Sequence, residues 1–131
     1  IADKCFVWKD GYYFITDRPL KLTDAQRLAS LMNGRLLTIS SADEEAFILK
    51  EGRGLYLWMS GWRKVVNNDW RDERNRPLRF VGKWAPKQAT GQMNLSIGTA
   101  TGQTRGWYDD GPWDGVVHAC IEWGEEYPEA K

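Results

Sequence analysis

The sequence predicts an α+β domain in which two helices pack on small antiparallel sheets and a long irregular loop region, at about residues 62–114, precedes the last strand. Three observations lead to this prediction. Two amphipathic segments with helix-capping residues follow each other early in the chain, strand-like runs stand near both ends, and little sustained periodicity is found from 63 to 105. A length of 131 residues is near the commonest domain size, so one domain over residues 1–131 is expected.

The first element is a predicted β-hairpin. From Cys5 to Ile15 the residues alternate and include several aromatics, which favour strands. Asp10 and Gly11 form a turn pair in the middle of this segment. We therefore expect two paired strands with the turn at Asp10-Gly11.

Two helices are predicted next, each with marked ends. Thr23 and Gln26 have the spacing of a capping box, and Asn33-Gly34 supplies a left-handed stop. Between these ends the apolar residues recur at helical spacing: Leu22, Ala25, Leu28, Ala29 and Met32. After a short apolar connector, Ser41 and Glu44 form a second capping box, acidic residues fill the following turn, and glycines at 52 and 54 end the second helix.

Two further strands enclose the irregular region. The segment 55–62, Leu-Tyr-Leu-Trp-Met-Ser-Gly-Trp, has the composition of a buried strand, and residues 116–123 form a closing strand. We expect the two ends of the chain to be neighbours in a sheet. The long stretch between these strands contains tryptophans among polar residues, which favours an ordered, functional excursion.

Composition excludes several classes of protein. Eighteen basic and eighteen acidic residues cancel, which gives a net charge of zero and a pI near 6.8. These values argue against a chain built mainly to bind nucleic acid or an anionic membrane. No apolar run approaches the roughly 18 residues needed to cross a bilayer, and no membrane insertion is expected. The first residue is Ile1 rather than Met, so we expect a processed chain or a fragment of a larger protein.

Catalysis is not expected. His118 is the only histidine, lies in the predicted closing strand and has no Ser or Cys nucleophile motif near it, which is typical of a structural histidine. The sequence also contains no Gly-rich phosphate loop or dinucleotide fingerprint.

Several segments together resemble the C-type lectin-like domain. LTDAQRLASLMNGRLLTI at 22–39 is similar to the first helix of that family and its connector, and SSADEEAFI at 40–48 is similar to the second helix. LYLWMSGW at 55–62 stands in the place of the Trp-Ile-Gly-Leu strand motif, and Trp107-Tyr108-Asp109 falls where the family has Trp-Asn-Asp. The resemblance covers nearly the whole chain and implies a ligand-binding module whose long loop region holds the site.

The cysteines depart from the family pattern. The family bridges a helix-one cysteine to the last-strand cysteine, but the matching helix position here is Ala29, and a loop cysteine is replaced by Asn94. This cysteine-poor pattern resembles bacterial or phage members of the family. Cys5 and Cys120 either form one end-to-end disulfide or remain two unpaired thiols.

Calcium ligands are also mostly missing. Sugar-binding members hold calcium through a Glu-Pro-Asn or Gln-Pro-Asp triplet and the late Asn-Asp pair, whereas the triplet region here is Lys87-Gln88-Ala89. A Glu-like position is Gln92, the late Asn is Tyr108, and only Asp109 survives. A rearranged site from Asp109, Asp110 and Asp114 is the alternative to a solvated acidic turn, which we favour. We therefore expect no cofactor and no metal.

The ligand site is predicted in the long loop region. By analogy with the family, Trp58, Trp84 and Trp107 belong to the core, whereas aromatics beside polar loop segments are expected to face a ligand. Residues 62–87 are rich in Arg and Lys and residues 107–131 in Asp and Glu, so the basic side chains either form a face for an acidic ligand or pair with the chain's own acidic end. The predicted ligand-binding residues are Trp62, Trp70, Arg71, Arg74, Arg76, Lys87, Gln88, Gln92, Asn94, Tyr108, Asp109, Asp110, Trp113 and Asp114.

The sequence thus predicts a non-catalytic recognition module. A protein or cell-surface ligand bound without calcium is favoured, since arginines and aromatics are plentiful and calcium ligands are not. A carbohydrate-binding lectin is the first alternative, and a structural domain of a larger surface or virion protein is the second. The expected location is extracellular, at a cell surface or on a virion, and the oligomeric state stays open.

Overall fold

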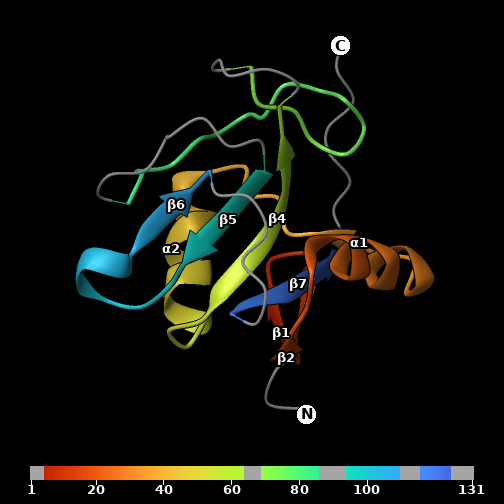
Figure 1. The fold of residues 1–131 in the computed structure, drawn as a ribbon, viewed down its shortest axis with the longest axis horizontal. Coiled ribbons are helices and arrows are strands. Elements are labelled where there is room, and N and C mark those ends of the chain that lie inside the picture. The colour runs from red at the N-terminus through yellow and green to blue at the C-terminus, as the bar shows by residue number, and fades with distance from the viewer. Residues whose placement is uncertain (1–4, 64–68, 86–93, 110–115, 125–131) are drawn as a thin grey trace.

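The computed structural model describes residues 5–63, 69–85, 94–109 and 116–124 (Figure 1). Within these residues the chain forms two helices, a short 3-10 helix at Gly102–Thr104 and a seven-stranded sheet. The helices are α1 (Leu22–Leu31) and α2 (Ala42–Glu51). The strands are β1 (Cys5–Trp8), β2 (Gly11–Pro19), β3 (Arg35–Leu36), β4 (Tyr56–Trp62), β5 (Asn94–Gly98), β6 (Gly106–Tyr108) and β7 (Val117–Trp123).

The sheet is centred on β7. The strand order is β1-β2-β7-β4-β5-β6, and β3 pairs with β7 as well. β7 runs antiparallel to β2 and parallel to β4, with Tyr56 opposite Val117 and Trp58 opposite Ala119. The predicted α+β class and the predicted pairing of the two chain ends are confirmed. The expected small antiparallel sheets are joined into one sheet by the parallel pair, which suits a strand as fully buried as β7.

The opening hairpin turns one residue earlier than predicted. Trp8 pairs with Gly11, so the two loop residues are Lys9 and Asp10, and Lys9 takes the left-handed conformation at φ 52°. Gly11 is the first residue of β2, where a Cβ would lie 3.0 Å from the Tyr13 hydroxyl and 3.2 Å from its ring.

The two helices differ in how their starts are capped. α1 begins at Leu22, because β2 continues to Pro19 and Leu22 is buried in the core; the predicted Thr23 capping box is therefore wrong. Asn33 at φ 57° ends α1 as predicted. In α2, Ser41 Oγ accepts a hydrogen bond from the Glu44 amide at 3.1 Å, as predicted, but the Glu44 carboxylate binds elsewhere.

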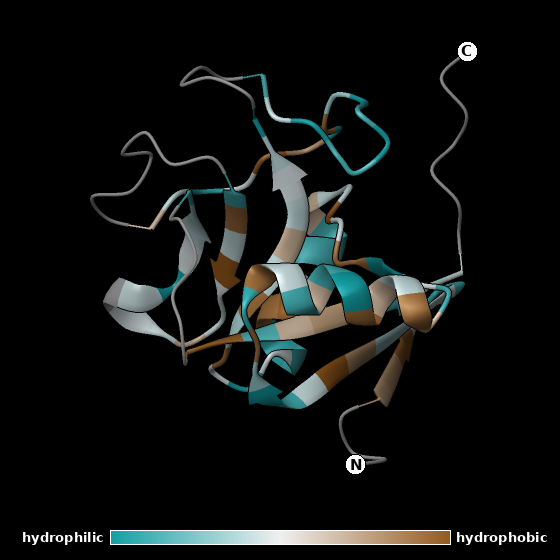
Figure 2. Ribbon diagram, turned by 45° about the vertical axis from the view of Figure 1, so that its right-hand side comes forward, coloured by the Kyte–Doolittle hydropathy of each residue, from teal (hydrophilic) through white to brown (hydrophobic). Residues whose placement is uncertain are grey.

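Each helix covers one face of the sheet. Alternate residues of β4 and β7 separate into two clusters, since successive strand side chains point to opposite faces. The cluster with α1, which lies across the sheet in Figure 2, includes Trp58, Ala119 and Ile121. The cluster with α2 includes Leu57, Ile97 and Trp107. Neither described helix has the length and apolar composition needed to span a membrane.

The two cysteines remain unbridged. Cys120 is fully buried in the α2-side cluster, whereas Cys5 is exposed on the edge strand β1. The structure therefore agrees with the unpaired-thiol alternative.

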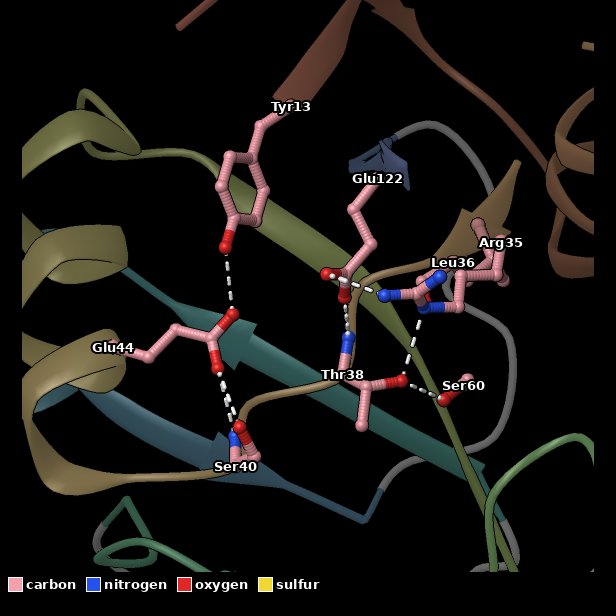
Figure 3. Close-up of polar contacts among 8 residues, drawn as sticks. All are labelled: Tyr13, Arg35, Leu36, Thr38, Ser40, Glu44, Ser60 and Glu122. Carbon is pink, nitrogen blue, oxygen red and sulfur yellow. Dashed lines mark hydrogen bonds and ion pairs between the residues drawn. The ribbon is translucent and has the colours of Figure 1, made fainter. Parts of the chain in front are cut away.

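A buried polar network connects the sheet to α2 (Figure 3). Tyr13 Oη on β2 donates to Glu44 Oε2 at 2.8 Å, and the other Glu44 oxygen accepts from the Ser40 amide at 2.9 Å. Glu122 on β7 accepts from the Thr38 amide and lies 3.4 Å from Arg35 Nη2. Two carboxylates thereby hold the connector between the helices against the sheet.

Burial dominates the electrostatics of this network. Desolvation raises the pKa of Glu122 to about 8, although Arg35 and the Thr38 amide favour the ionised form. The same cause, together with the hydrogen bond to Glu44, raises the pKa of Tyr13 well above its usual range. Burial thus shifts Glu122 towards its protonated form in the folded chain.

The raised pKa of Glu122 predicts that stability falls as pH rises. The unfolded carboxyl ionises near 4.5, so the native state loses free energy of unfolding between about pH 4.5 and 8, by roughly 2–5 kcal/mol. Glu122→Gln keeps an acceptor for the Thr38 amide without ionising and should remove most of this slope. Urea unfolding at pH 5 and pH 9 measures the difference. Parallel stability profiles for the two proteins would show that Glu122 does not titrate in this window.

Candidate functional site

The long loop region begins with an ordered turn built on Asp72. Trp62, the last residue of β4, exchanges two backbone hydrogen bonds with Arg71 at 2.9 and 2.7 Å. The buried Asp72 Oδ1 accepts from the amides of Arg74 and Arg76 at 2.8 and 3.0 Å, and its backbone oxygen accepts from Trp62 Nε1 at 2.7 Å. The indole of Trp62 is therefore fixed by the turn that follows it.

A pocket of about 450 Å³ opens beside this turn. We call it the Trp62 pocket, and it is lined by Gln26, Leu36, Ser60, Trp62, Glu73 and Asn94. Residues of α1, β3, β4, β5 and the Asp72 turn meet there. Desolvation raises the pKa of Glu73, while Arg35 and Arg74 oppose the shift. A half-buried indole thus stands among amide, hydroxyl and carboxyl groups.

A buried ion pair lies at the same end of the sheet. Arg63 directly follows β4 and Asp109 directly follows β6, and their side chains meet at 3.0 Å between Nη2 and Oδ2. The Arg63 side chain is 5% exposed and that of Asp109 is not exposed. The guanidinium also lies over the ring of Trp70, 4.3 Å from its centroid. This arrangement, the Arg63 cluster, is defined by Arg63, Trp70 and Asp109.

The structure brings some predicted site residues together. Trp62 and Asn94 line the same pocket, and they are paired residues of β4 and β5. Arg71 binds the nearby Asp69 at 2.9 Å, and Arg76 lies 3.4 Å from Asp72. Arg71 and Arg76 therefore pair with carboxylates of the same chain.

Two predicted ligand contacts are buried instead. Trp70 is 3% and Tyr108 is 5% exposed, so the expectation that both present aromatic faces to a ligand is wrong. Trp70 packs against Trp84, with 5.9 Å between ring centroids, and Tyr108 packs edge-on against Tyr56. These long-range partners account for the burial.

The other predictions divide between confirmed and untested. Trp58 and Trp107 are core residues as expected, and Trp84 is half-buried against the core. His118 has a structural contact, since its Nδ1 lies 2.8 Å from the Thr16 oxygen. Arg74 is exposed. Six predicted ligand-binding residues lie outside the described residues: Lys87, Gln88, Gln92, Asp110, Trp113 and Asp114.

The surviving carboxylate of the expected calcium site is already paired. Asp109 contacts Arg63, which fits the predicted alternative that a basic loop residue pairs with the acidic end of the chain. Among the described residues, no group of three or more His, Cys, Asp or Glu side chains is placed to hold a metal ion. Arg63 belongs to the basic segment 62–87 whose charge asymmetry predicted such a pair, although it was not among the predicted ligand-binding residues. Gln26, Ser60 and Glu73 were not predicted, because only the fold brings them to Trp62.

Solved structures resemble this chain over nearly its full length. The carbohydrate-recognition domain of cow CD23, determined with a GlcNAc2Man3 oligosaccharide, has a TM-score of 0.76 at 16% identity and covers 95% of both chains. The carbohydrate-recognition domain of the human scavenger receptor C-type lectin has a TM-score of 0.76 at 16% identity, covering 93% of this chain and 97% of that one. The chain has the C-type lectin-like fold.

The C-type lectin-like fold is not tied to one function among these neighbours. A calcium-independent type II antifreeze protein matches with a TM-score of 0.74 at 13% identity over 92% of both chains. Two of these three neighbours are described as carbohydrate-recognition domains and one as an antifreeze protein, and none is described as an enzyme. No protein-family profile and no curated protein sequence matches the chain. The resemblance to bacterial or phage members stays a prediction.

The Arg63 cluster predicts a specific pattern of stability. Arg63→Met leaves the buried Asp109 carboxylate without its guanidinium partner and should cost about 3–5 kcal/mol of unfolding free energy. Adding Asp109→Asn should recover part of that loss, because the remaining polar group carries no charge. Denaturant unfolding of both single variants and the double variant gives the coupling energy. Strictly additive losses would mean that the two side chains do not interact.

Proposed function

We propose that this chain is a non-catalytic recognition module that binds its ligand without calcium, through the Trp62 pocket. The observation that supports calcium independence most strongly is the Arg63–Asp109 pair. Calcium takes six to eight oxygen ligands and depends on carboxylates for affinity. Asp109 is the one carboxylate at a position that the family resemblance assigns to calcium, and a guanidinium already neutralises it.

The Arg63 cluster also joins two strand ends at the position where a bound cation would otherwise do so. Arg63 follows β4 and Asp109 follows β6, so the pair ties together two strand ends on either side of β5. The stacked Trp70 ring shields the pair from solvent on one face. A loop region held in this way keeps its shape without a bound ion. The antifreeze neighbour is described as calcium-independent, so at least one solved structure with a similar fold is of a protein described in this way.

The lining of the Trp62 pocket favours a glycan as ligand. Sugar rings offer hydroxyl groups for hydrogen bonds and an apolar face for an aromatic ring. Gln26, Ser60 and Asn94 supply neutral polar groups next to the indole of Trp62. Two of the fold neighbours are carbohydrate-recognition domains. A glycan displayed outside the cell is the ligand class that best matches these features.

A protein ligand is the second candidate. Arg74 and Arg79 are exposed in the loop region, and Val81 is an exposed apolar residue close to them in sequence. Arginines beside apolar side chains are common at protein interfaces. A protein partner that covers this surface would lose affinity when Arg74 and Arg79 are replaced, whereas a glycan confined to the Trp62 pocket would not.

Calcium is predicted to leave stability unchanged. A ligand that binds only the folded state raises the melting temperature, and millimolar calcium at a tight site would do so by several degrees. We expect a shift below about 1 °C between calcium chloride and chelator. Thermal unfolding followed by circular dichroism checks this, with magnesium chloride as the control for ionic strength. A calcium-specific increase of several degrees would contradict calcium independence.

The Trp62 pocket is predicted to control glycan binding. Gln26→Ala removes an exposed amide from α1 and should weaken binding about three- to tenfold without loss of stability. Trp62→Ala should abolish detectable binding because the aromatic wall is lost. An array of immobilised glycans, read with calcium and with chelator, provides the probe. Tyr12→Ala, which removes an exposed ring on β2, is the matched control and should bind normally.

Two results would contradict the proposal. One is glycan binding that requires calcium, and the other is glycan binding that persists in folded Trp62→Ala. If the array shows no glycan signal, the glycan ligand is rejected and the exposed Arg74 and Arg79 surface becomes the site to test.

A further inference from the structure

A second cavity lies on the other side of the fold from α1. Its volume is about 460 Å³, and its walls are the side chains of Glu45, Leu49, Lys83, Trp84 and Arg105 with the backbone at Gly102 and Gly106. We call it the Trp84 cavity. It is bounded by α2, the short 3-10 helix and β6, and it shares no residue with the Trp62 pocket. In Figure 1 these elements lie at the opposite end of the molecule from α1.

The walls of the Trp84 cavity are held in place by backbone contacts. Trp107 on β6 exchanges hydrogen bonds at 2.9 Å with the Lys83 oxygen and the Ala85 amide, which fixes the segment that presents Lys83 and Trp84. Gly106, at φ 132°, allows this close approach, because a Cβ there would come within 2.7 Å of the Ala85 nitrogen. The half-buried Trp84 indole and Leu49 form the apolar part of the wall.

The charges in the cavity are not balanced. Glu45 Oε2 accepts a 2.6 Å hydrogen bond from Trp107 Nε1, which orients the carboxylate. Arg105 donates to the Thr99 oxygen at 3.3 Å. Within the described part of the chain, neither Lys83 nor Arg105 forms an ion pair. Among the described wall residues, two cations and one carboxylate leave an excess of one positive charge.

We propose that the Trp84 cavity binds a carboxylate-bearing pyranose, the chemistry of a uronic acid residue. The ligand carboxylate pairs with Lys83 and Arg105, ring hydroxyls donate to Glu45, and the apolar face of the ring packs on Trp84. Each wall group then has a chemical counterpart in one monosaccharide. This site is independent of the Trp62 pocket and of the function proposed for it.

Other ligand classes fit the cavity less well. A neutral sugar provides no charge for the two cations, so the excess positive charge remains unpaired. A polyphosphate would satisfy both cations but would place further negative charge beside the Glu45 carboxylate. An apolar molecule would bury Lys83, Arg105 and Glu45 without hydrogen bonds. A monoanion that also has hydroxyl groups meets all three requirements.

The test compares two probes that differ only at the charged group. Methyl β-D-glucuronide and methyl β-D-glucoside are titrated into the ¹⁵N-labelled chain, and the indole signal of Trp84 and the amide signals of Gly102 and Gly106 are followed by NMR. We expect the glucuronide to shift these signals and to bind at least about tenfold more tightly than the glucoside. Lys83→Gln and Arg105→Gln should each weaken glucuronide binding about three- to tenfold. Lys21→Gln, at an exposed residue before α1, is the matched control and should bind normally.

Several results would overturn this inference. Equal affinity for both probes would reject the role of the carboxylate, and unchanged glucuronide binding in the folded Lys83→Gln/Arg105→Gln double variant would reject the site. Shifts confined to the Trp62 indole, or no shifts at all at millimolar glucuronide, would do the same. A Trp62→Ala variant that still binds glucuronide separates this site from the Trp62 pocket, so failure of one proposal leaves the other testable.

Discussion

The ion pair between Arg63 and Asp109 determines how the long loop region is attached to the sheet. β4, β5 and β6 are neighbours, and antiparallel pairing brings the end of β4, the start of β5 and the end of β6 to the same end of the sheet. Arg63 and Asp109 follow the strands at this end and contact each other there. The loop that follows β4 and the loop that follows β6 are therefore held together at their starts by one buried contact.

Burial strengthens the attraction between Arg63 and Asp109 and also imposes a desolvation cost on both charges. Two charges buried this deeply lose their hydration, and the cost is offset only when geometry is good and further contacts are present. The 3.0 Å distance and the Trp70 ring over the guanidinium supply both conditions. The loop region thus gains a fixed anchor, and the Asp72 turn and the Trp62 pocket lie directly beside it. The candidate site depends on the ion pair through this attachment.

Local sequence signals predicted both helices and the strands near the two ends of the chain. They missed β5, β6 and the short 3-10 helix, which lie inside the region expected to be irregular, and they misplaced some boundaries. Asn33 and Ser41 mark helix ends because capping depends on neighbouring residues alone. The Thr23 box failed because distant contacts of β2 and the burial of Leu22 decide where α1 begins. In the hairpin, Gly11 pairs with Trp8 as a strand residue beside the Tyr13 side chain rather than lying in the turn. Boundaries therefore follow from packing that local patterns do not contain.

The candidate site was predictable only in part, for a related reason. Trp62 and Asn94 were predicted from their place beside strands, and they line one pocket. Trp70 and Tyr108 were expected to be exposed because polar residues surround them in sequence, yet distant rings bury them. Arg63 and Asp109 are 46 residues apart, so only the uneven distribution of charge pointed to their contact. Lining residues such as Gln26 and Glu73 carry no local signal, since they meet only in the folded chain.

The most direct test of this account is NMR detection of the Arg63 guanidinium in the intact chain. If Arg63 replaces a bound cation, its guanidinium protons should exchange slowly, show contacts to the Trp70 ring and remain unchanged when millimolar calcium chloride is added. Loss or movement of these signals on calcium addition would show that calcium competes for Asp109, and the account would be wrong.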